Sequence, residues 1–346
     1  MKKRIMNFTL AALACAMTAP SFASYANHPE TVKVADELAQ EGLDRDRILA
    51  LLGGAQRQEK ILELIARPAE KTLTWADYRR IFVQPDRVEQ GLAFWQQHQQ
   101  TLNEVQAAHG VPAEMILAIL GVETRYGRHK GTYRVIDALT TLGFDYPPRA
   151  TFFRSQLKEL FRLEQKAGID ISEVTGSYAG AMGYPQFIPT SYIHYAIDQD
   201  QDGRIDLLGN PVDAMGSIAN YFKVHGWQAG LPVAARARVK GDAWRKLIQP
   251  LGKPQTTLGA AKAAGAASVT CKESSFCFTD LANDTPIALI ELEGENGSEF
   301  WLTTNNFYVI TRYNHSYLYA MAAYHLAQEL ARAQAQEEAK HRGERH

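Results

Sequence analysis

The chain has 346 residues, with 37 basic and 38 acidic side chains, a formal charge of −1, 46% apolar and 22% charged residues. These values are typical of a globular protein and exclude intrinsic disorder, a collagen-like repeat and a coiled coil. The near-neutral charge also argues against nucleic acid as a partner, because neutralising phosphates requires a basic excess. Since domains usually have ~100–200 residues, the length predicts two domains or one elaborated domain.

The first 23 residues predict a signal peptide that is removed on export. Basic residues 2–4 precede an apolar run at 8–17, which is too short to span a bilayer, and Ser21-Phe22-Ala23 fits the small-x-small cleavage rule. A buried N-terminal helix is the alternative. Cleavage after Ala23 removes three basic residues and no acidic one, which changes the formal charge from −1 to −4.

Three cysteines bear on anchoring and on disulfide formation. Leu13-Ala14-Cys15 approximates a bacterial lipoprotein signal with its Leu one position away from the usual place, so lipidation at Cys15 stays open. Cys271 and Cys277 remain in the mature chain, and an oxidising compartment would allow them to form a disulfide. Neither a His nor a third Cys adjoins them, so a metal or catalytic role is not expected.

The hydrophobic spacing predicts helices first and strands later. Residues 24–110 are expected to form an N-terminal helical region, and 111–230 a helical core interrupted by loops at 143–149 and 176–189. Short antiparallel strands are expected within 231–312, at 267–271, 276–280, 287–293, 299–304 and 307–312. Residues 313–346 return to a helix with a charged tail. The predicted class is mainly α with a small β region.

Glu123 ends a helix that is apolar all round, and such helices are buried. It follows Ile116, Ile119 and Leu120 by seven, four and three residues, so it shares their face and should point inward. Burial disfavours the ionised form of a carboxyl group, which suits a general acid near neutral pH. The alternative is a surface Glu123 that pairs with Arg125 or Arg128.

Two further segments carry residues that are typical of ligand-binding sites. Residues 176–191 combine glycines and prolines with aromatic, Gln and Ser side chains, which suits a sugar site, although a packed structural loop is the alternative. Asp198, Asp200 and Asp202 alternate before Gly203, as in the first positions of an EF-hand calcium loop. Position 12 holds Gly209 instead of Glu, so Asp213 would have to close the ring. A solvated acidic turn is the alternative.

Five separated motifs, in this order, resemble the B-type lytic murein transglycosylases (the MltB group) over about residues 30–335. They are Gly121–Gly127, Phe144–Pro147, Gly180–Pro189, Asn220–Phe222 and Ile310–Ser316. The resemblance implies a lysozyme-like helical core that acts in the periplasm, possible outer-membrane attachment only through Cys15, and a protein that works as a monomer. It implies cleavage of the β-1,4 bond between N-acetylmuramic acid and N-acetylglucosamine in peptidoglycan, with a 1,6-anhydromuramoyl product.

The resemblance also implies roles for individual residues. Glu123 falls on the family's single catalytic acid/base. The glycan groove falls on Ser177, Gln186, Tyr221, Tyr313, Asn314 and Tyr319, with Arg149 as a contact to the stem peptide. A structural Ca²⁺ falls on Asp198, Asp200, Asp202, the carbonyl of Arg204, and Asp213. Two features depart from the family: Pro148 stands where an Arg is usual, and Asn210-Pro211 lengthens the acidic loop.

The chemistry agrees with this assignment. Most glycosidases need two carboxylates, whereas Glu123 has no second carboxylate near it in sequence. An anhydro product removes that need, because the nucleophile is the C6 hydroxyl of the sugar. Three alternatives stay open: a muramidase or chitinase-like hydrolase, a non-catalytic calcium-stabilised periplasmic glycan-binding protein, and a calcium sensor, which the single site disfavours.

Overall fold

The computed structural model describes residues 25–66, 73–269, 278 and 280–343. The predicted signal peptide, Cys15, Cys271, Cys277 and most of the predicted strand at 276–280 lie outside these residues. Within the described residues, no single helix is long and apolar enough to cross a bilayer, and only the bent pair α6 (Gln99–His109) and α7 (Ala113–Thr124) meets that test when its two members are counted together.

The N-terminal region is helical, as the sequence predicts, and local signals explain several of its boundaries. Asp44 caps α2 by accepting hydrogen bonds from the backbone N–H groups of Asp46 and Arg47. Thr74 and Asp77 form a reciprocal capping box at the start of α4. The helices before α6 are α1 (Pro29–Gln40), α2 (Arg45–Gly53), α3 (Glu59–Ala66), α4 (Trp75–Phe82) and α5 (Pro85–Gln97).

The central region surrounds the buried helix α7. Its further helices are α8 (Val135–Asp145), α9 (Ala150–Ala167), α10 (Pro189–Tyr195) and α11 (Pro211–Val224). A short 3₁₀ turn at Pro147–Arg149 joins α8 to α9. Two short strands, β1 (Tyr133–Arg134) and β2 (Thr175–Gly176), pair antiparallel and bring the Gly-rich stretch next to the end of α7.

The β region is a five-stranded antiparallel sheet in the order β4-β6-β7-β3-β5. Leu289, Leu302 and Trp244 belong to its own small apolar core, which is separate from the large helical core. The strands are β3 (Ala234–Val239), β4 (Thr256–Thr257), β5 (Ala266–Ser268), β6 (Pro286–Gly294) and β7 (Gly297–Thr303), with helix α12 at Leu258–Ala263.

One predicted strand is wrong. Residues 307–312 lie inside helix α13 (Asn305–Tyr313), so the β region ends at Thr303. Thr304 starts this helix by accepting a hydrogen bond from the N–H of Asn306. Asn306 is fully buried and bonds to the backbone of the segment before β3, which fixes the helix against the core. Tertiary packing therefore overrides the β-branched and aromatic composition of this run.

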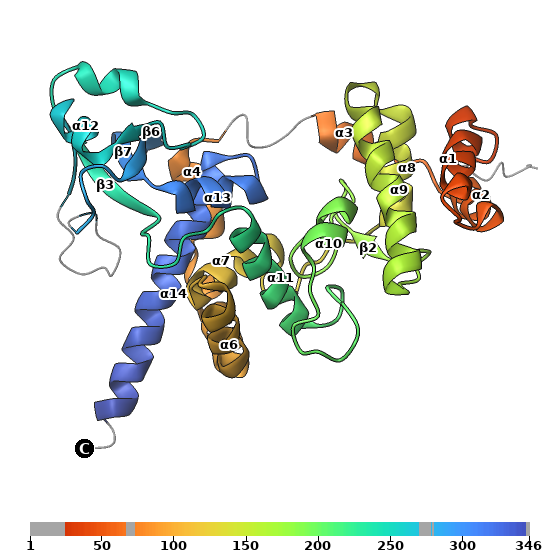
Figure 1. Cartoon of the computed structure of the whole chain (residues 1–346), viewed down its shortest axis with the longest axis horizontal. Coiled ribbons are helices and arrows are strands. Elements are labelled where there is room, and N and C mark those ends of the chain that lie inside the picture. The colour runs from red at the N-terminus through yellow and green to blue at the C-terminus, as the bar shows by residue number, and fades with distance from the viewer. Residues whose placement is uncertain (1–24, 67–72, 270–277, 279, 344–346) are drawn as a thin grey trace, which may run out of the picture.

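Figure 1 shows an elongated molecule with the sheet near one end and α1, α2, α8 and α9 near the other. Helices α7, α11 and α13 lie between these ends, and the long helix α14 (Tyr317–Gly343) packs along α7 before it projects away from the body. The catalytic candidate Glu123 therefore sits at the end of the central helix, where segments far apart in the sequence converge.

Candidate active site

Helix α7 is the buried centre of the protein. Each side chain from Met115 to Leu120 is 2% exposed or less, as its continuous apolar run predicts. The helix ends at Thr124, where Arg125 adopts a left-handed conformation with φ of 48° and the N–H of Tyr126 bonds to the carbonyl of Leu120. This termination leaves Glu123 half-buried in the last turn, at the edge of the core rather than inside it.

A hydrogen bond from Tyr319 fixes the carboxyl group of Glu123. The Tyr319 hydroxyl donates to Glu123 Oε1 at 2.6 Å, across 196 residues of sequence. Burial, and after it the negative charge of Glu123, raises the pKa of Tyr319 well above its usual value, so the phenol remains a donor. Arg125, one of the two surface partners that the sequence allowed for Glu123, pairs with Asp86 at 3.0 Å.

Two more tyrosines form an aromatic wall beside this pair. The ring of Tyr313 stacks on that of Tyr319 with an interplanar angle of 7°, and the ring of Tyr221 meets Tyr313 edge-on at 4.9 Å. The Tyr313 hydroxyl donates to the carbonyl of Pro185 and the Tyr221 hydroxyl to that of Arg312, both at 2.6 Å. These hydrogen bonds therefore hold the two tyrosines in place. Their rings supply apolar surface of the kind that sugars pack against.

The Gly-rich loop brings Ser177 and Gln186 to the same region. Ser177 Oγ accepts hydrogen bonds from the N–H groups of Ala179 and Ala181, which fixes a tight turn. Gln186 has a positive φ of 50°, rare for a residue other than Gly, and its amide donates to the carbonyls of Lys130 and Gly183. The loop is thus packed by its own hydrogen bonds, and its role as a sugar site stays a prediction.

The two remaining groove candidates lie differently. Asn314 follows α13 directly, next to Tyr313, and is half-buried. Arg149 is exposed on the 3₁₀ turn before α9, where its guanidinium covers the ring of Phe152 at 4.4 Å. Arg149 thus belongs to a different element from Glu123 and the aromatic wall, and its contact with the stem peptide stays a prediction.

Sequence reasoning missed two residues that hold the site together. The Thr124 hydroxyl donates to the carbonyl of Tyr184 at 3.0 Å and accepts from the N–H of Gly127, so it ties the Gly-rich loop to the end of α7. Arg87 is 6% exposed and donates to the carbonyl of Gly121 in the last turns of α7. Thr124 could have been noticed inside the first motif, whereas nothing in the local sequence marks Arg87.

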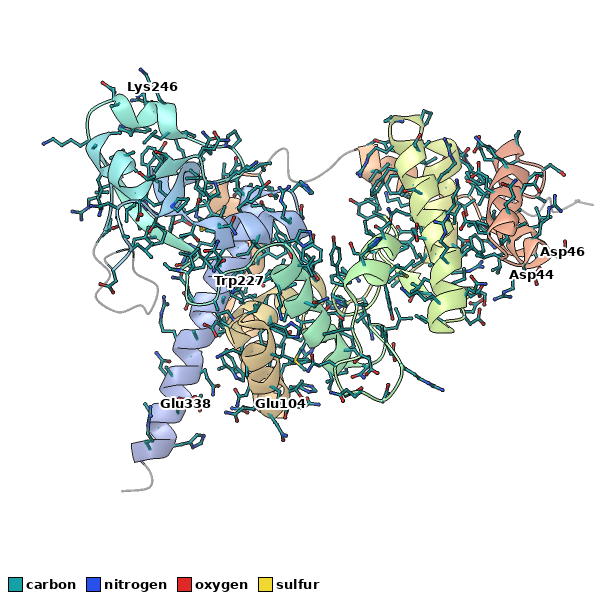
Figure 2. The ribbon with its side chains drawn as sticks, viewed as in Figure 1. Asp44, Asp46, Glu104, Trp227, Lys246 and Glu338 are labelled. Atoms are coloured by element: carbon teal, nitrogen blue, oxygen red, sulfur yellow. The ribbon has the colours of Figure 1, made fainter. Side chains whose placement is uncertain are left out.

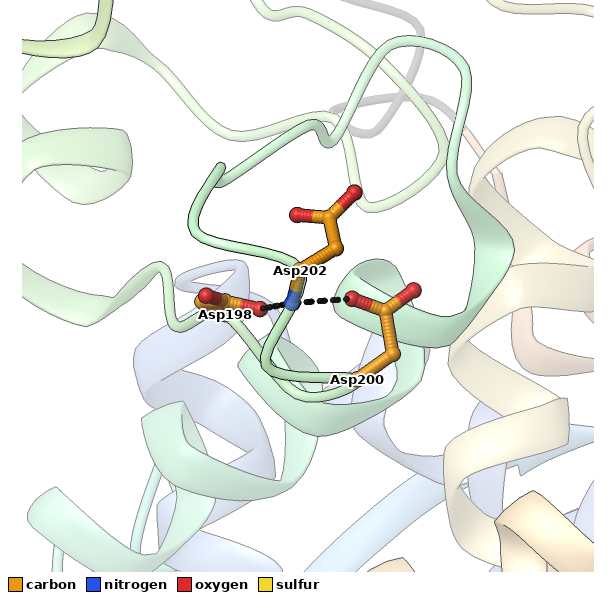
Figure 3. A group of neighbouring side chains, drawn as sticks. All are labelled: Asp198, Asp200 and Asp202. Atoms are coloured by element: carbon orange, nitrogen blue, oxygen red, sulfur yellow. Dashed lines mark hydrogen bonds between the residues drawn. The ribbon is translucent and has the colours of Figure 1, made fainter.

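The acidic loop forms a compact group of carboxylates between α10 and α11. Each of Asp198, Asp200 and Asp202 offers an oxygen atom, and these atoms lie within 4.8 Å of one another. Figure 3 shows the carboxyl groups of Asp198 and Asp200 on either side of the backbone N–H of Asp202, which donates to both. Asp198 and Asp200 thus shape the loop and also face one common point.

The rest of the loop is closed by backbone hydrogen bonds. Asp213 is fully buried, lies outside the group of three, and accepts hydrogen bonds from the N–H groups of Gln199 and Asp206 at 2.8 Å. Burial, followed by the charges of Asp200 and Asp198, raises the pKa of Asp213. Asn210, part of the lengthened loop, donates from its side chain to Asp200. The N–H of Arg204 donates to Asp202.

Comparison with known proteins identifies the family. The family model described as Transglycosylase SLT domain matches residues 26–328. The chain belongs to this family. Its helical core with a small sheet is the lysozyme-like fold of the lytic transglycosylases, so the predicted fold class is confirmed.

Relatives with full-length matches support the same assignment. The chain is 39% identical over 323 residues to the membrane-bound lytic murein transglycosylase B of Escherichia coli, covering 90% of this chain and 85% of that protein. It is 42% identical to the soluble lytic transglycosylase SltB1 of Pseudomonas aeruginosa, with a TM-score of 0.82 over 89% of this chain and 100% of that one. The lytic transglycosylase Slt35 of Escherichia coli, solved in complex with calcium, is 39% identical, with a TM-score of 0.80 over 90% and 95% of the two chains.

Members of this family cleave the glycan of murein, and the prediction that the chain is a peptidoglycan lytic transglycosylase is confirmed at this level. The alternatives of a non-catalytic glycan-binding protein and of a calcium sensor are set aside, because all three relatives named above are enzymes.

Proposed function

We propose that Glu123 is the single general acid and base of this transglycosylase, acting on the β-1,4 bond between N-acetylmuramic acid and N-acetylglucosamine. The observation that supports the proposal most strongly is the 2.6 Å hydrogen bond from Tyr319 to Glu123 Oε1. It orients the carboxyl group. Of all charged groups, Glu123 also has the largest effect on the pKa values of both Tyr313 and Tyr319, which raises them.

The reaction then needs one carboxyl group and no water. Glu123 donates its proton to the glycosidic oxygen while the bond from that oxygen to C1 of the muramic acid breaks. The C6 hydroxyl of the same sugar attacks C1 and forms the 1,6-anhydro ring. Glu123 takes up the proton that this hydroxyl loses, so the enzyme returns to its starting state.

The surrounding residues have separate tasks in this mechanism. The rings of Tyr221 and Tyr313 provide apolar surface for the sugar rings, and the polar groups of Ser177, Gln186 and Asn314 provide hydrogen bonds. Oriented dipoles of this kind stabilise the developing oxocarbenium ion. We assign Arg149, which is exposed on the 3₁₀ turn before α9, to contact with the stem peptide.

A product analysis tests the proposal. Purified peptidoglycan sacculi are digested with the enzyme, and the released muropeptides are identified by mass spectrometry. Muropeptides with 1,6-anhydromuramoyl ends are expected. Free reducing ends would instead identify a hydrolase on the same scaffold.

We also propose that Asp198, Asp200 and Asp202 bind a structural Ca²⁺, helped by the carbonyl of Arg204 and by Asp213. The donor set fits, because oxygen atoms within 4.8 Å of one another can share one ion at the usual Ca–O distance of ~2.4 Å. Asp213 would help by holding the loop in shape, because its carboxyl group already accepts hydrogen bonds from the backbone N–H groups of Gln199 and Asp206. The calcium complex of Slt35 supports this proposal.

For localisation, we propose export to the periplasm by the signal peptide at residues 1–23 and function as a monomer. The two relatives differ in attachment, because one is described as membrane-bound and the other as soluble. A Cys15→Ser variant decides between them here: loss of the protein from the membrane fraction means lipidation at Cys15, and an unchanged soluble fraction means cleavage after Ala23.

A further inference from the structure

A second cavity lies at the far end of the helix pair that holds the active site. It is enclosed by the first turn of α7, the segment between α11 and β3, and the middle of α14, and has a volume of about 170 Å³. Six of its wall residues are apolar: Pro112, Met115, Trp227, Leu231, Val233 and Ala327. A cavity needs only ~10–15 Å³ to hold one water molecule, so this one has room for a small organic molecule.

The cavity is separate from the catalytic site. Glu114 in its wall lies nine residues before Glu123 on α7, and Gln328 lies nine residues after Tyr319 on α14. At a rise of ~1.5 Å per residue, the two ends of each helix segment are about 14 Å apart. Trp227, labelled in Figure 2, lies between α11 and α14 in that view, away from the acidic loop.

Most polar groups in the wall already have partners. The Tyr324 hydroxyl donates to the carbonyl of Ala234 at 2.6 Å and accepts from the amide nitrogen of Gln328 at 2.9 Å. The indole N–H of Trp227 donates to the carbonyl of Gly110. These bonds fix the shape of the cavity and leave one N–H of the Gln328 amide as the remaining donor among these side chains.

Two acceptors remain in the same wall. Within the described part of the chain, the carboxyl group of Glu114 receives a recorded hydrogen bond only from its own backbone N–H, and the amide oxygen of Gln328 receives none. Glu114 is half-buried, and this burial raises the pKa of its carboxyl group. An apolar cavity with a partnerless carboxyl group is suited to a ligand that brings positive charge.

We propose that this cavity binds a small primary ammonium ion on a short apolar chain. An ammonium group has three donors and no acceptor, so it matches the carboxyl group of Glu114 and the amide oxygen of Gln328. The hydrocarbon chain would pack against Met115, Leu231 and Trp227. The alternative is that Glu114 only complements the N-terminal dipole of α7. In that case no ligand binds in the cavity.

The test uses n-butylammonium as the probe, n-butanol as its uncharged counterpart, and isothermal titration calorimetry on the full mature chain. Saturable binding of n-butylammonium is expected, at least tenfold tighter than that of n-butanol. Glu114→Gln keeps the shape and removes the charge, so it should weaken n-butylammonium at least tenfold. Glu89→Gln, an exposed carboxyl group on α5, is the matched control and should change nothing.

Each other outcome overturns the proposal. No saturable binding would leave Glu114 with its dipole role alone. Equal affinity for the alcohol and the ammonium ion, or unchanged affinity in Glu114→Gln, would mean an unselective apolar cavity. If Glu114→Gln does not fold, the alcohol comparison on the native chain and the Gln328→Leu variant still decide the question. Because the test measures binding directly, its failure would leave the assignment of glycan cleavage to Glu123 unaffected.

Discussion

Helix α7 and the acidic loop are two parts of the same region that are held in place by opposite means. Met115 to Leu120 of α7 are almost entirely removed from water, so apolar packing fixes the helix and with it Glu123. The loop at 198–213 is organised by carboxylates that accept backbone N–H groups, and its like charges repel one another. The comparison teaches that the core positions the proposed catalytic carboxyl group, whereas the proposed Ca²⁺ would supply the counter-charge of the loop.

The two parts are nevertheless in contact. The N–H of Tyr184 in the Gly-rich loop donates to the carbonyl of Leu207, and the carbonyl of Tyr184 accepts from Thr124 beside Glu123. The side chain of Lys130 donates to the carbonyl of Leu208. The predictions below separate what each part contributes.

The largest expected effect is on catalysis. Glu123→Gln keeps the shape of the side chain but cannot donate and recover a proton, so activity on sacculi should fall by at least ~10²-fold. Its melting temperature should stay close to that of the native protein, because the packing of α7 is unchanged. Turbidity assays and calorimetry measure the two quantities. Substantial remaining turnover would mean that another residue is the acid.

Tyr319→Phe should have a smaller effect on rate together with a shift in pH dependence. Loss of the phenol removes a hydrogen bond that favours the ionised carboxylate. The catalytic carboxyl group should then keep its proton to higher pH, which moves the alkaline limb of the pH–rate profile upward. We expect a fall in rate of roughly tenfold. A tenfold slower variant with an unshifted profile would assign Tyr319 to packing alone.

Calcium removal should act on stability. With Ca²⁺ at about a hundred times its dissociation constant, binding contributes ~2.7 kcal/mol, which corresponds to a rise of about 5 °C in melting temperature. Asp198→Asn should abolish that rise, while Asp36→Asn, an exposed carboxyl group on α1, should preserve it. Equal melting temperatures in Ca²⁺ and in chelator would show that the protein binds no stabilising Ca²⁺.

The smallest expected effect concerns Cys271 and Cys277, which lie outside the described residues. A disulfide across this short loop contributes ~2–3 kcal/mol in the chain-entropy model, so reduction should lower stability and leave glycan cleavage intact. Thiol titration of the denatured, unreduced mature chain measures the bond. Two free thiols per chain would show that it does not form.

The sequence predicts much of this architecture because its strongest signals are local. The apolar run before Glu123, the alternating Asp residues and the Gly-rich stretch each identify a segment without its partners. The sequence predicts a strand at 307–312 because Tyr308, Val309 and Ile310 favour strands. The segment is helical instead, and the buried contacts of Asn306 that fix this helix come from residues 228 and 231. Strand β3 was not predicted, because its alternating Ala and Arg have little β-propensity.

Apart from Glu123 and the acidic loop, the candidate site was predictable residue by residue only through the family resemblance. The contact from Tyr319 to Glu123 spans 196 residues, and no periodicity in either segment indicates the other. Arg87 lies on an ordinary polar helix, and only the fold reveals that it bonds to the carbonyl of Gly121. Long-range contacts of this kind are set by packing and not by local pattern.

The most direct test of the central claim is digestion of sacculi in water enriched in ¹⁸O, followed by mass spectrometry of the muropeptides. If Glu123 alone passes the proton and the C6 hydroxyl is the nucleophile, the new ends are 1,6-anhydromuramoyl groups without ¹⁸O. Incorporation of one ¹⁸O atom at each new end would show that water attacks C1 and would contradict the account.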